Sequence, residues 1–272
     1  MTVLHSIILG IIQGLTEFLP VSSSAHLNLF PWLMGWEMTE SFDVALHIGT
    51  LLAMVIYFFK DWINLVKGGF NMLVKKEVSR DGRMFWFLVF ATIPAGALSL
   101  VLDKVSDKLL GEEALGLNGS MLVIGITLIL LGVVLYIADI KGENNIDYNH
   151  LNIKQVIYIA LSQAIAAAFP GTSRSGITMT TARFLGVDRS SAARLSFMLA
   201  MPITLAAVVF DLDQFAFDAP FFLGILFSFI VGMGVVKFLL DYLKSKSFKV
   251  FAIYRVVAGI VVIAAFVIKS IN

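Results

Sequence analysis

The chain alternates long apolar stretches with short polar segments, and six of the apolar stretches predict membrane-spanning helices. At about 1.5 Å of rise per residue, roughly 20 residues cross a hydrocarbon core of about 30 Å. Two stretches reach this length without any charge, and the others reach it by extending through flanking semi-polar residues. The predicted spans are Val44–Phe59, Met84–Leu102, Ser120–Ala138, Leu195–Phe210, Phe221–Val236 and Phe251–Ile268.

Two further apolar regions, Thr2–Trp36 and Val156–Leu185, are interrupted by proline and by hydroxyl-bearing residues. Pro20 divides the first region and Pro170 divides the second, so each half is too short to cross a membrane alone. A broken helix is tolerated at membrane depth only where its backbone is buried in protein or lines a wet cavity. We predict that each region forms a re-entrant helical hairpin.

The two broken regions resemble each other at a constant offset of 150 residues. Each region precedes three predicted spans, and an odd number of spans inverts the second set relative to the first. Inverted repeats built on broken helices place their ligand at the repeat interface. Chance similarity between two apolar segments is the alternative explanation. Three identities fix the offset, pairing Gln13 with Gln163, Pro20 with Pro170, and Ser23 with Ser173.

The predicted fold is therefore an all-α polytopic membrane protein, with six transmembrane helices and two re-entrant hairpins in inverted-topology repeats. We expect one membrane domain over residues 1–272, with repeat one at about 1–140 and repeat two at about 150–272. The segment Met1–Thr16 has neither a basic n-region nor a small-residue cleavage site, so we expect it to stay in the fold.

Composition agrees with this prediction and excludes several classes of protein. Hydrophobic residues make up 58% of the chain and charged residues only 14%, against roughly 25% charged residues in soluble domains. The mean hydropathy is +0.89. These values exclude an ordinary cytosolic enzyme, a disordered protein and a nucleic-acid binder, and the formal charge of +1 adds no attraction for polyanions. The absence of cysteine excludes disulfides, thiolate metal sites and cysteine nucleophiles.

Basic residues predict the orientation of the spans, because cytoplasmic loops are enriched in lysine and arginine. Eleven basic residues lie in three segments that face one side, against three on the other side. We therefore expect the first group to be cytoplasmic and both termini to be extracytoplasmic. The basic group is Lys60–Arg83, Asp139–Gln155 and Asp241–Val250, and the other is Asp103–Gly119, Asp211–Pro220 and the C-terminal tail.

The two breaks predict an anion site. In Pro20-Val-Ser-Ser-Ser-Ala-His26 a proline ends one half-helix and serines can cap the next, and Pro170-Gly-Thr-Ser-Arg-Ser-Gly176 has the same form. Two helix N-termini then meet with unpaired N–H groups, which suits phosphate. Arg174 adds a planar fork of donors, and Thr178 lies on the same helical face. The alternative for Arg174 is a structural ion pair with Glu17.

Other polar residues of the first region predict acid–base or metal chemistry. Gln13 and Glu17 share one helical face, and a carboxylate there could hold a divalent cation or take a proton from a hydroxyl. The alternative is that Glu17 caps the second half-helix. Ser23 and His26 are neighbours three residues apart, and His26 could instead be a hydrogen-bonded buried imidazole. His47 lies among apolar residues, and we favour a structural role for it.

The remaining intramembrane arginines lie near the ends of hairpins or spans. There a long side chain can keep its charged group in water while its stem stays in the apolar layer. We expect this snorkelling role for Arg183, Arg189, Arg194 and Arg255.

Two motifs resemble those of a known family, the undecaprenyl-pyrophosphate phosphatases of the bacitracin-resistance type. The first is Gln13-Gly-Leu-Thr-Glu17-Phe-Leu-Pro-Val-Ser-Ser, where the family has Glu or Gln, three residues, then Glu. The second is Pro170-Gly-Thr-Ser-Arg-Ser-Gly-Ile-Thr178, where the family has Pro-Gly-x-Ser-Arg-Ser-x-x-Thr. His26 falls where the family has its histidine. Weaker similarity, at Ser196–Pro202 and Phe251–Arg255, extends the resemblance over nearly the whole chain.

The resemblance implies a bacterial plasma-membrane enzyme that hydrolyses undecaprenyl pyrophosphate to undecaprenyl phosphate and orthophosphate. Such an enzyme recycles the carrier lipid for peptidoglycan synthesis and confers bacitracin resistance. It implies dependence on Mg²⁺ or Ca²⁺, and contact with the lipid substrate and membrane lipids but not with nucleic acid. The oligomeric state that we consider for this protein is a homodimer. The alternative function is a secondary transporter or flippase for an anionic or lipid-linked substrate.

Carried over by position, the resemblance implies catalytic roles for Glu17, Ser23 and His26, and metal binding by Gln13 and Glu17. The chain has Gln13 where some members have a second Glu, which puts in doubt a mechanism with two carboxylates on the metal. We expect Ser23 to attack, with metal-bound water or His26 as alternative nucleophiles, in a site open to the extracytoplasmic side. The predicted pyrophosphate ligands are Ser22, Ser173, Arg174, Ser175, Gly176 and Thr178.

Overall fold

The computed structural model describes residues 1–210, 215 and 217–271, and all regular structure in that part is helical apart from one isolated bridge between Ile146 and Val187. Residues 211–214, in the segment expected to be extracytoplasmic, lie outside the described residues. In chain order the helices are α1 (Val3–Thr16), α2 (Ser23–Met34), α3 (Glu40–Tyr57), α4 (Phe59–Val74), α5 (Arg80–Leu110), α6 (Glu112–Lys141), the 3₁₀ turn η1 (Tyr148–His150), α7 (Ile153–Leu161), α8 (Gln163–Ala168), α9 (Arg174–Phe184), α10 (Arg189–Phe210), α11 (Ala219–Leu243) and α12 (Lys249–Ile271).

Among the described residues, six helices are long and apolar enough to cross a membrane: α3, α5, α6, α10, α11 and α12. Each coincides with one predicted span, so the prediction of an all-helical, multi-pass membrane protein is confirmed. The predicted span Val44–Phe59 is too long at its end, because α3 stops at Tyr57 and Phe59 already begins α4.

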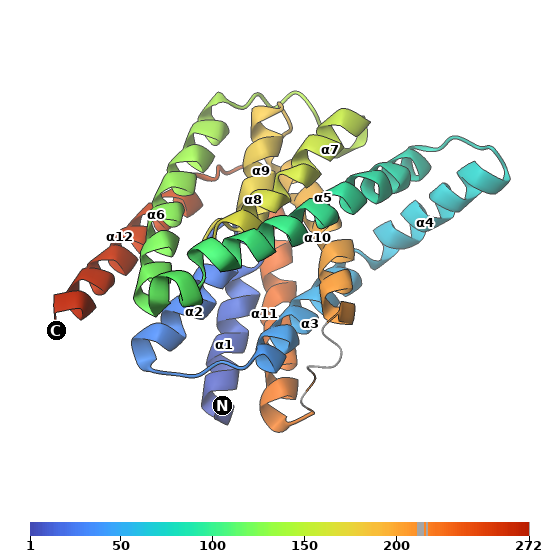
Figure 1. Cartoon of the computed structure of the whole chain (residues 1–272). Helices are drawn as coiled ribbons and strands as arrows, with labels where there is room; N and C mark the ends of the chain where they lie inside the picture. Colours follow the sequence, from blue (N-terminus) through green and yellow to red (C-terminus); the bar gives the residue numbers. More distant parts are fainter. Residues whose placement is uncertain (211–214, 216, 272) are drawn as a thin grey trace.

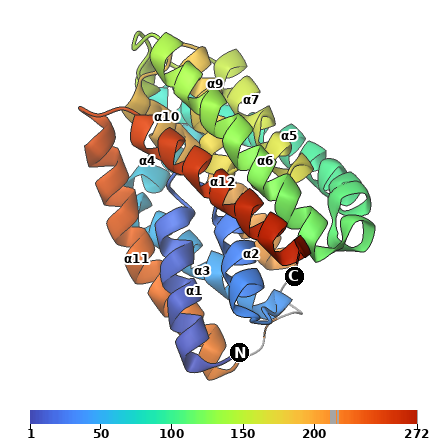
Figure 2. The same ribbon diagram turned by 90° about the vertical axis from the view of Figure 1, so that its left-hand side faces the viewer.

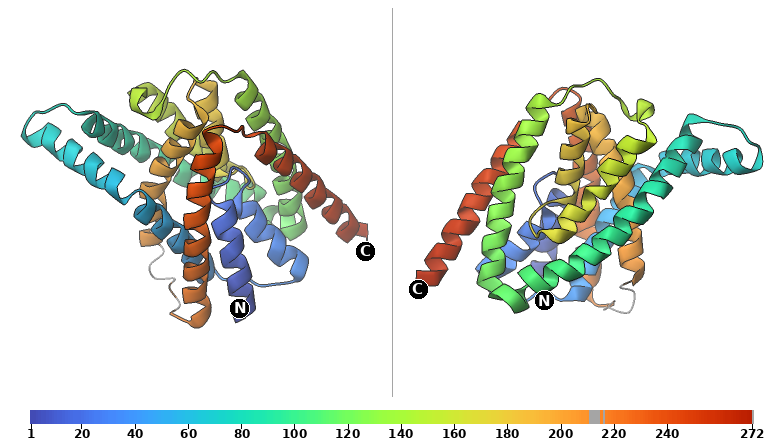
Figure 3. Two further views of the ribbon diagram at one scale, coloured as in Figure 1. Left: turned by 180° about the vertical axis from the view of Figure 1, so that it is seen from behind. Right: turned by 45° about the horizontal axis from the view of Figure 1, so that its top comes forward.

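Both termini lie at one end of the molecule, together with the turn between α5 and α6 (Figures 1 and 3). The connection between α6 and α7 lies at the opposite end. The connections between α4 and α5 and between α11 and α12, which also contain basic residues, lie toward that same end (Figures 1 and 3). The orientation in the membrane that the basic residues predict stays a prediction.

The basic segment Lys60–Arg83, expected to be a loop, instead contains a helix of its own. It forms α4 and the start of α5, which pack together and extend as an arm away from the other helices (Figure 1). Leu65 and Gly69 of α4 are buried, while Val66 and Phe70, which lie on another face of the helix, are exposed. Counting charges assigns a segment to one side of the membrane, but it does not detect an amphipathic helix within it.

The two halves of the sequence interlace instead of lying side by side. The late helix α11 packs against the early helices α1 and α3, and the early helix α5 packs against α7 and α8. Figure 2 shows α11 beside α1 and α12 beside α6. The packing of α3 on α11 is especially close, since an added Cβ at Gly49 would overlap the hydroxyl of Ser228 and the carbonyl of Ile225. Small residues permit such backbone approach between membrane helices.

Three of the arginines expected to snorkel make fixed contacts. The expectation is wrong for Arg183, which is buried, while the side chains of Arg189 and Arg194 stay 26% and 38% exposed. Arg183 is fully buried and donates to the carbonyl of Glu143 at 3.1 Å and to Asn144 Oδ1 at 2.8 Å. These bonds join the end of α9 to the segment after α6, where backbone carbonyls have no helical partner. Two more pairs are Arg189 with Asp139, at 2.6 Å, and Arg194 with Asp61.

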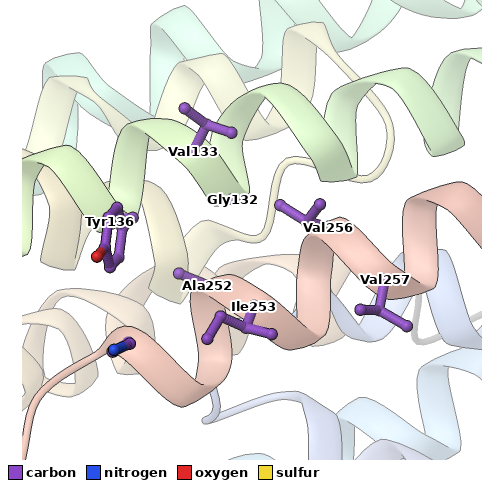
Figure 4. Close-up of a pocket in the computed structure, with 8 residues that line it drawn as sticks. Gly132, Val133, Tyr136, Ala252, Ile253, Val256 and Val257 are labelled. Atoms are coloured by element: carbon purple, nitrogen blue, oxygen red, sulfur yellow. The ribbon is translucent and has the colours of Figure 1, made fainter.

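An apolar pocket of about 260 Å³ lies between α6 and α12 (Figure 4). Gly132 and Val133 line it from α6, and Ile253 and Val257 from α12. Apart from Tyr136 and Lys249 the lining is aliphatic, which suits a hydrocarbon chain and not a phosphate group.

Candidate active site

The first break connects α1 to α2 through a serine in an unusual backbone conformation. Ser22 is the N-cap of α2 and has φ of 76°, a value that residues with a Cβ rarely adopt. Its hydroxyl accepts a hydrogen bond from the amide of Ala25 at 3.3 Å. A serine cap of this kind satisfies one of the free N–H groups at a helix N-terminus.

The second break repeats this geometry. Ser173 is the N-cap of α9, has φ of 70°, and accepts from the amide of Gly176 at 3.1 Å. In both breaks the capping hydroxyl lies 3.2 Å from the hydroxyl of the serine two residues later, Ser24 or Ser175. The same local structure therefore starts α2 and α9.

This geometry corrects the sequence alignment by one residue, because Ser22 and not Ser23 is the counterpart of Ser173. One residue separates Pro20 from its capping serine, whereas two separate Pro170 from Ser173. The additional residue is accommodated by Gly171, whose φ of +86° favours glycine. Ser23 is therefore the counterpart of Arg174.

The carboxylate of Glu17 lies at the centre of a cluster formed by both breaks. Ser23 Oγ donates to Glu17 Oε2 at 2.6 Å, and the Arg174 guanidinium forms an ion pair with Glu17 Oε1. Gln13 Nε2 donates to Oε2 at 3.4 Å. The side chain of Glu17 is only 7% exposed. Four predicted site residues are thus in contact, and they bring an anion, a cation and a hydroxyl together in a largely buried group.

Arg174 also connects this cluster to a pocket of about 270 Å³ between α3 and α10. Its Nη1 donates to Thr204 Oγ1 at 2.7 Å, and both residues line the pocket. His47 and Asp43 line the other side, with His47 Nδ1 at 2.9 Å from the backbone oxygen of Asp43. No sequence motif marks Thr204, and the position of His47 among apolar residues favoured a structural role.

His26 lies next to the first break but is not hydrogen-bonded to Ser23 or Glu17. Its Nδ1 is 2.7 Å from the backbone oxygen of Ser22, and its Nε2 is 2.6 Å from the hydroxyl of Tyr254 on α12. Both ring nitrogens are therefore engaged away from the carboxylate cluster. The contact between Tyr254 and His26 was not predicted, because the two residues are far apart in the sequence.

Two predicted phosphate ligands join helices in this structure. Ser175 Oγ donates to the carbonyl of Leu19 at 3.1 Å, which links α9 to the first break. Thr178 is fully buried and lies 2.7 Å from Ser196 Oγ on α10. Contact of either residue with phosphate stays a prediction.

Arg255 is buried between the two breaks, so its expected snorkelling is wrong. It is 1% exposed, and its guanidinium donates to the carbonyls of Pro20 and Gly171, each at 3.3 Å. Breaks free backbone carbonyls that need donors away from water. An added Cβ at Gly176 would lie 2.7 Å from Arg255 Nη1, so glycine there makes room for this side chain. The sequence did contain a signal for this buried role, because a charged residue within a predicted span is usually functional.

The oxygen atoms of Gln13 and Glu17 fit the ligand preference of Mg²⁺ and Ca²⁺. Gln13 Oε1 is buried and has no hydrogen-bond partner among the described residues, and its amide already contacts the Glu17 carboxylate. The same part of the chain contains no group of three or more histidine, cysteine or acidic residues that could hold a metal. Further ligands would have to be water or substrate oxygens, as is usual for Mg²⁺.

Comparisons with known proteins identify relatives over the full length of the chain. The family model described as bacitracin resistance protein BacA matches residues 6–261. The undecaprenyl-diphosphatase of Pelotomaculum thermopropionicum is 43% identical over 267 residues, which cover 97% of this chain and 96% of the relative. The undecaprenyl-diphosphatase of Caldicellulosiruptor bescii is 40% identical over 277 residues, covering 100% of both chains. That of Desulforudis audaxviator is 43% identical over 270 residues, covering 98% of both.

Proposed function

The chain belongs to the family of the bacitracin resistance protein BacA, and from this premise we propose that it is an undecaprenyl-diphosphatase. It hydrolyses undecaprenyl diphosphate to undecaprenyl phosphate and orthophosphate, which recycles the carrier lipid. The observation that carries this proposal is the Glu17 carboxylate, which binds a hydroxyl from one break and a guanidinium from the other.

Ser23 is the proposed nucleophile. Its hydroxyl donates to Glu17 Oε2 at 2.6 Å, which is the arrangement of a nucleophile and its general base. As Ser23 Oγ bonds to the terminal phosphorus, its proton passes to Glu17 and the bond from phosphorus to the bridging oxygen breaks. Undecaprenyl phosphate leaves, and water then hydrolyses the phosphoserine. Because both nitrogens of His26 are engaged elsewhere, the geometry favours Ser23 over His26.

Arg174 and the two helix N-termini are proposed to bind the diphosphate. The guanidinium can present two parallel N–H groups to phosphate oxygens, as it now does to Glu17 and Thr204. The dipoles of α2 and α9 favour negative charge at their N-termini. In phosphoryl transfer, such fixed donors supply most of the stabilisation of the transition state.

A divalent cation is proposed to be held by Gln13 Oε1 and Glu17 Oε2. When bound, it would neutralise charge on the diphosphate oxygens. Gln13 positions its amide against the carboxylate, and the burial of both side chains excludes bulk water.

We propose that the site is reached from the extracytoplasmic side through the pocket between α3 and α10. That pocket involves the start of α3 and the second half of α10, toward the end of the molecule that contains both termini. The positive-inside rule assigns this end to the outside.

We also propose that the two broken segments are re-entrant hairpins of inverted repeats. Matching caps at Ser22 and Ser173 support this arrangement. A second support is that α1 packs on α11 as α7 and α8 pack on α5, the corresponding helix of the other half.

The test is phosphate release by the purified protein in detergent, with undecaprenyl diphosphate and Mg²⁺. We expect orthophosphate from the wild type, and at least about 100-fold less from Glu17→Gln. If the wild type releases none, yet moves the lipid between leaflets of liposomes, the transporter alternative replaces the phosphatase.

A further inference from the structure

His26 is connected to the last helix through Tyr254. The two rings are stacked, with centroids 5.7 Å apart and an interplanar angle of 11°, and His26 Nε2 lies 2.6 Å from the tyrosine hydroxyl. His26 is 6% exposed, whereas Tyr254 is 46% exposed. A stacked and hydrogen-bonded partner of this kind fixes the plane of the imidazole ring as well as its direction.

The partners of His26 also define its tautomer. A backbone carbonyl only accepts hydrogen bonds, so Nδ1, 2.7 Å from the Ser22 oxygen, must carry the hydrogen. In the neutral ring Nε2 is then the acceptor, and the hydroxyl of Tyr254 donates to it. The Ser22 carbonyl thus sets the tautomer, and removing the Tyr254 hydroxyl would leave Nε2 without this hydrogen bond from α12.

The bond from His26 to Ser22 reaches the backbone just before the proposed nucleophile. Ser22 has the positive φ of the cap, and Ser23 is the next residue. The backbone bond from the amide of His26 to the same carbonyl is long, at 3.4 Å. The imidazole therefore makes the shorter of the two bonds that fix this carbonyl, and thereby the start of α2.

The next residue of α12 contacts the same break. Arg255 donates to the carbonyl of Pro20, two residues before Ser22. Two consecutive side chains of α12 thus contact this region, Arg255 at the break and Tyr254 at His26 in the helix that follows it.

We propose that Tyr254 is a positioning residue for the hydrolysis, acting through His26 on the Ser22 cap and so on the direction of the Ser23 hydroxyl. This inference rests on the proposed function of Ser23 as nucleophile. Tyr254 itself touches no group of the carboxylate cluster, and its role is to hold the plane and direction of the His26 ring.

Tyr254→Phe tests the proposal, because it removes the hydroxyl and keeps the ring. We expect kcat to fall by about 10-fold or more with little change in KM, as for other residues that orient a catalytic group. In a His26→Gln background the same change should cause no further fall, since the hydroxyl then has no imidazole to orient. The matched control is Tyr158→Phe, on an exposed tyrosine of α7, which should leave kcat unchanged.

A second measurement needs no activity. The chain has four histidines, so ¹⁵N-histidine NMR of the wild type, assigned with His26→Gln, reads the tautomer directly. We expect Nδ1–H for His26 in both proteins, because the Ser22 carbonyl is present in both. In Tyr254→Phe the Nε2 resonance should shift, since that nitrogen loses its hydrogen bond from the tyrosine hydroxyl.

A wild-type Nε2–H tautomer overturns the proposal even if Tyr254→Phe does not fold. Additive effects of Tyr254→Phe and His26→Gln on kcat also overturn the proposal, and so does an unchanged kcat in Tyr254→Phe. Because the tautomer is measured without substrate, it is decided separately from phosphate release.

Discussion

Ser23 and Arg174 occupy equivalent positions in the two halves of the chain, and both bind the carboxylate of Glu17. Each is the first helical residue after a serine cap with positive φ. One half supplies a hydroxyl and the other a guanidinium, so a repeated backbone structure produces a site with two chemically different sides. We infer that the first half provides the attacking group and the second half binds the anion.

Ser23→Ala should lower kcat by at least about 10³-fold, because a lost nucleophile costs more than a lost proton-transfer group. Phosphate release under saturating substrate measures the effect. Ser270→Ala, on an exposed serine near the end of α12, is the control and should keep full activity. If Ser23→Ala retains more than about a tenth of kcat while His26→Ala abolishes it, the histidine is the nucleophile.

Arg174→Lys should reduce kcat/KM by at least about 100-fold, although the charge is kept. The guanidinium contacts Glu17 and Thr204 at once, and a single ammonium cannot reproduce that fork. The same substitution at Arg194, in the partly exposed pair with Asp61, is the matched control and should have little effect. Equal losses in the two variants would contradict a specific role of Arg174.

Gln13→Ala should raise the Mg²⁺ concentration needed for half-maximal activity by about 10-fold or more, because it removes one proposed oxygen ligand. Gln163→Ala is the matched control, since that glutamine is also buried but donates to the carbonyl of Ala160. Titration of activity with Mg²⁺ after chelation measures both. An unchanged Mg²⁺ requirement in Gln13→Ala would exclude Gln13 as a ligand.

The six spans were predictable because uninterrupted apolar length is a local property, and each coincides with a helix of the structure. Gln13, Glu17, Ser23 and Arg174 could also be selected from the sequence, since intramembrane polar residues at helical spacing stand out against an apolar background. The structure brings the four into contact, and their roles stay predictions. The contact between His26 and Tyr254 was not, because it joins residues far apart in sequence and depends on how α12 crosses the first break.

The predicted location of Arg255 at the membrane surface was wrong for a related reason. Its position near one end of a predicted span suggested the membrane surface, but the interlaced packing places that part of α12 against both breaks. Sequence periodicity predicts helices and does not predict which helices of the two halves become neighbours.

Gly49→Ala should destabilise the protein by about 1–3 kcal/mol, because the added methyl overlaps Ser228 and the backbone of α11. Gly96→Ala is the matched control. No atom lies within 4 Å of an added Cβ there, so this helical substitution should stabilise by up to about 1 kcal/mol. Thermal unfolding in detergent compares the two, and equal shifts in Tm would contradict the close packing of α3 on α11.

Cysteines at Glu77 and Glu37 should be labelled from opposite sides of the membrane. Both residues are exposed, Glu77 between α4 and α5 and Glu37 between α2 and α3, and the chain has no native cysteine to interfere. In intact cells an impermeant maleimide should label Glu37→Cys, and Glu77→Cys only after permeabilisation. The reverse pattern would invert the proposed orientation.

The interlaced halves also determine when the protein can acquire its structure during synthesis. The surfaces of α1 and α3 that receive α11 are complete long before α11 leaves the ribosome, and α6 likewise precedes its partner α12. The nascent first half therefore enters the bilayer with its glycine-lined contact surfaces facing lipid, as a loose set of inserted helices. The contacts between distant segments form only after translation is almost finished, and such late, non-local assembly is slow. A chain that ends before α11 should consequently be a target for membrane quality-control proteases, even though it contains both Glu17 and Arg174.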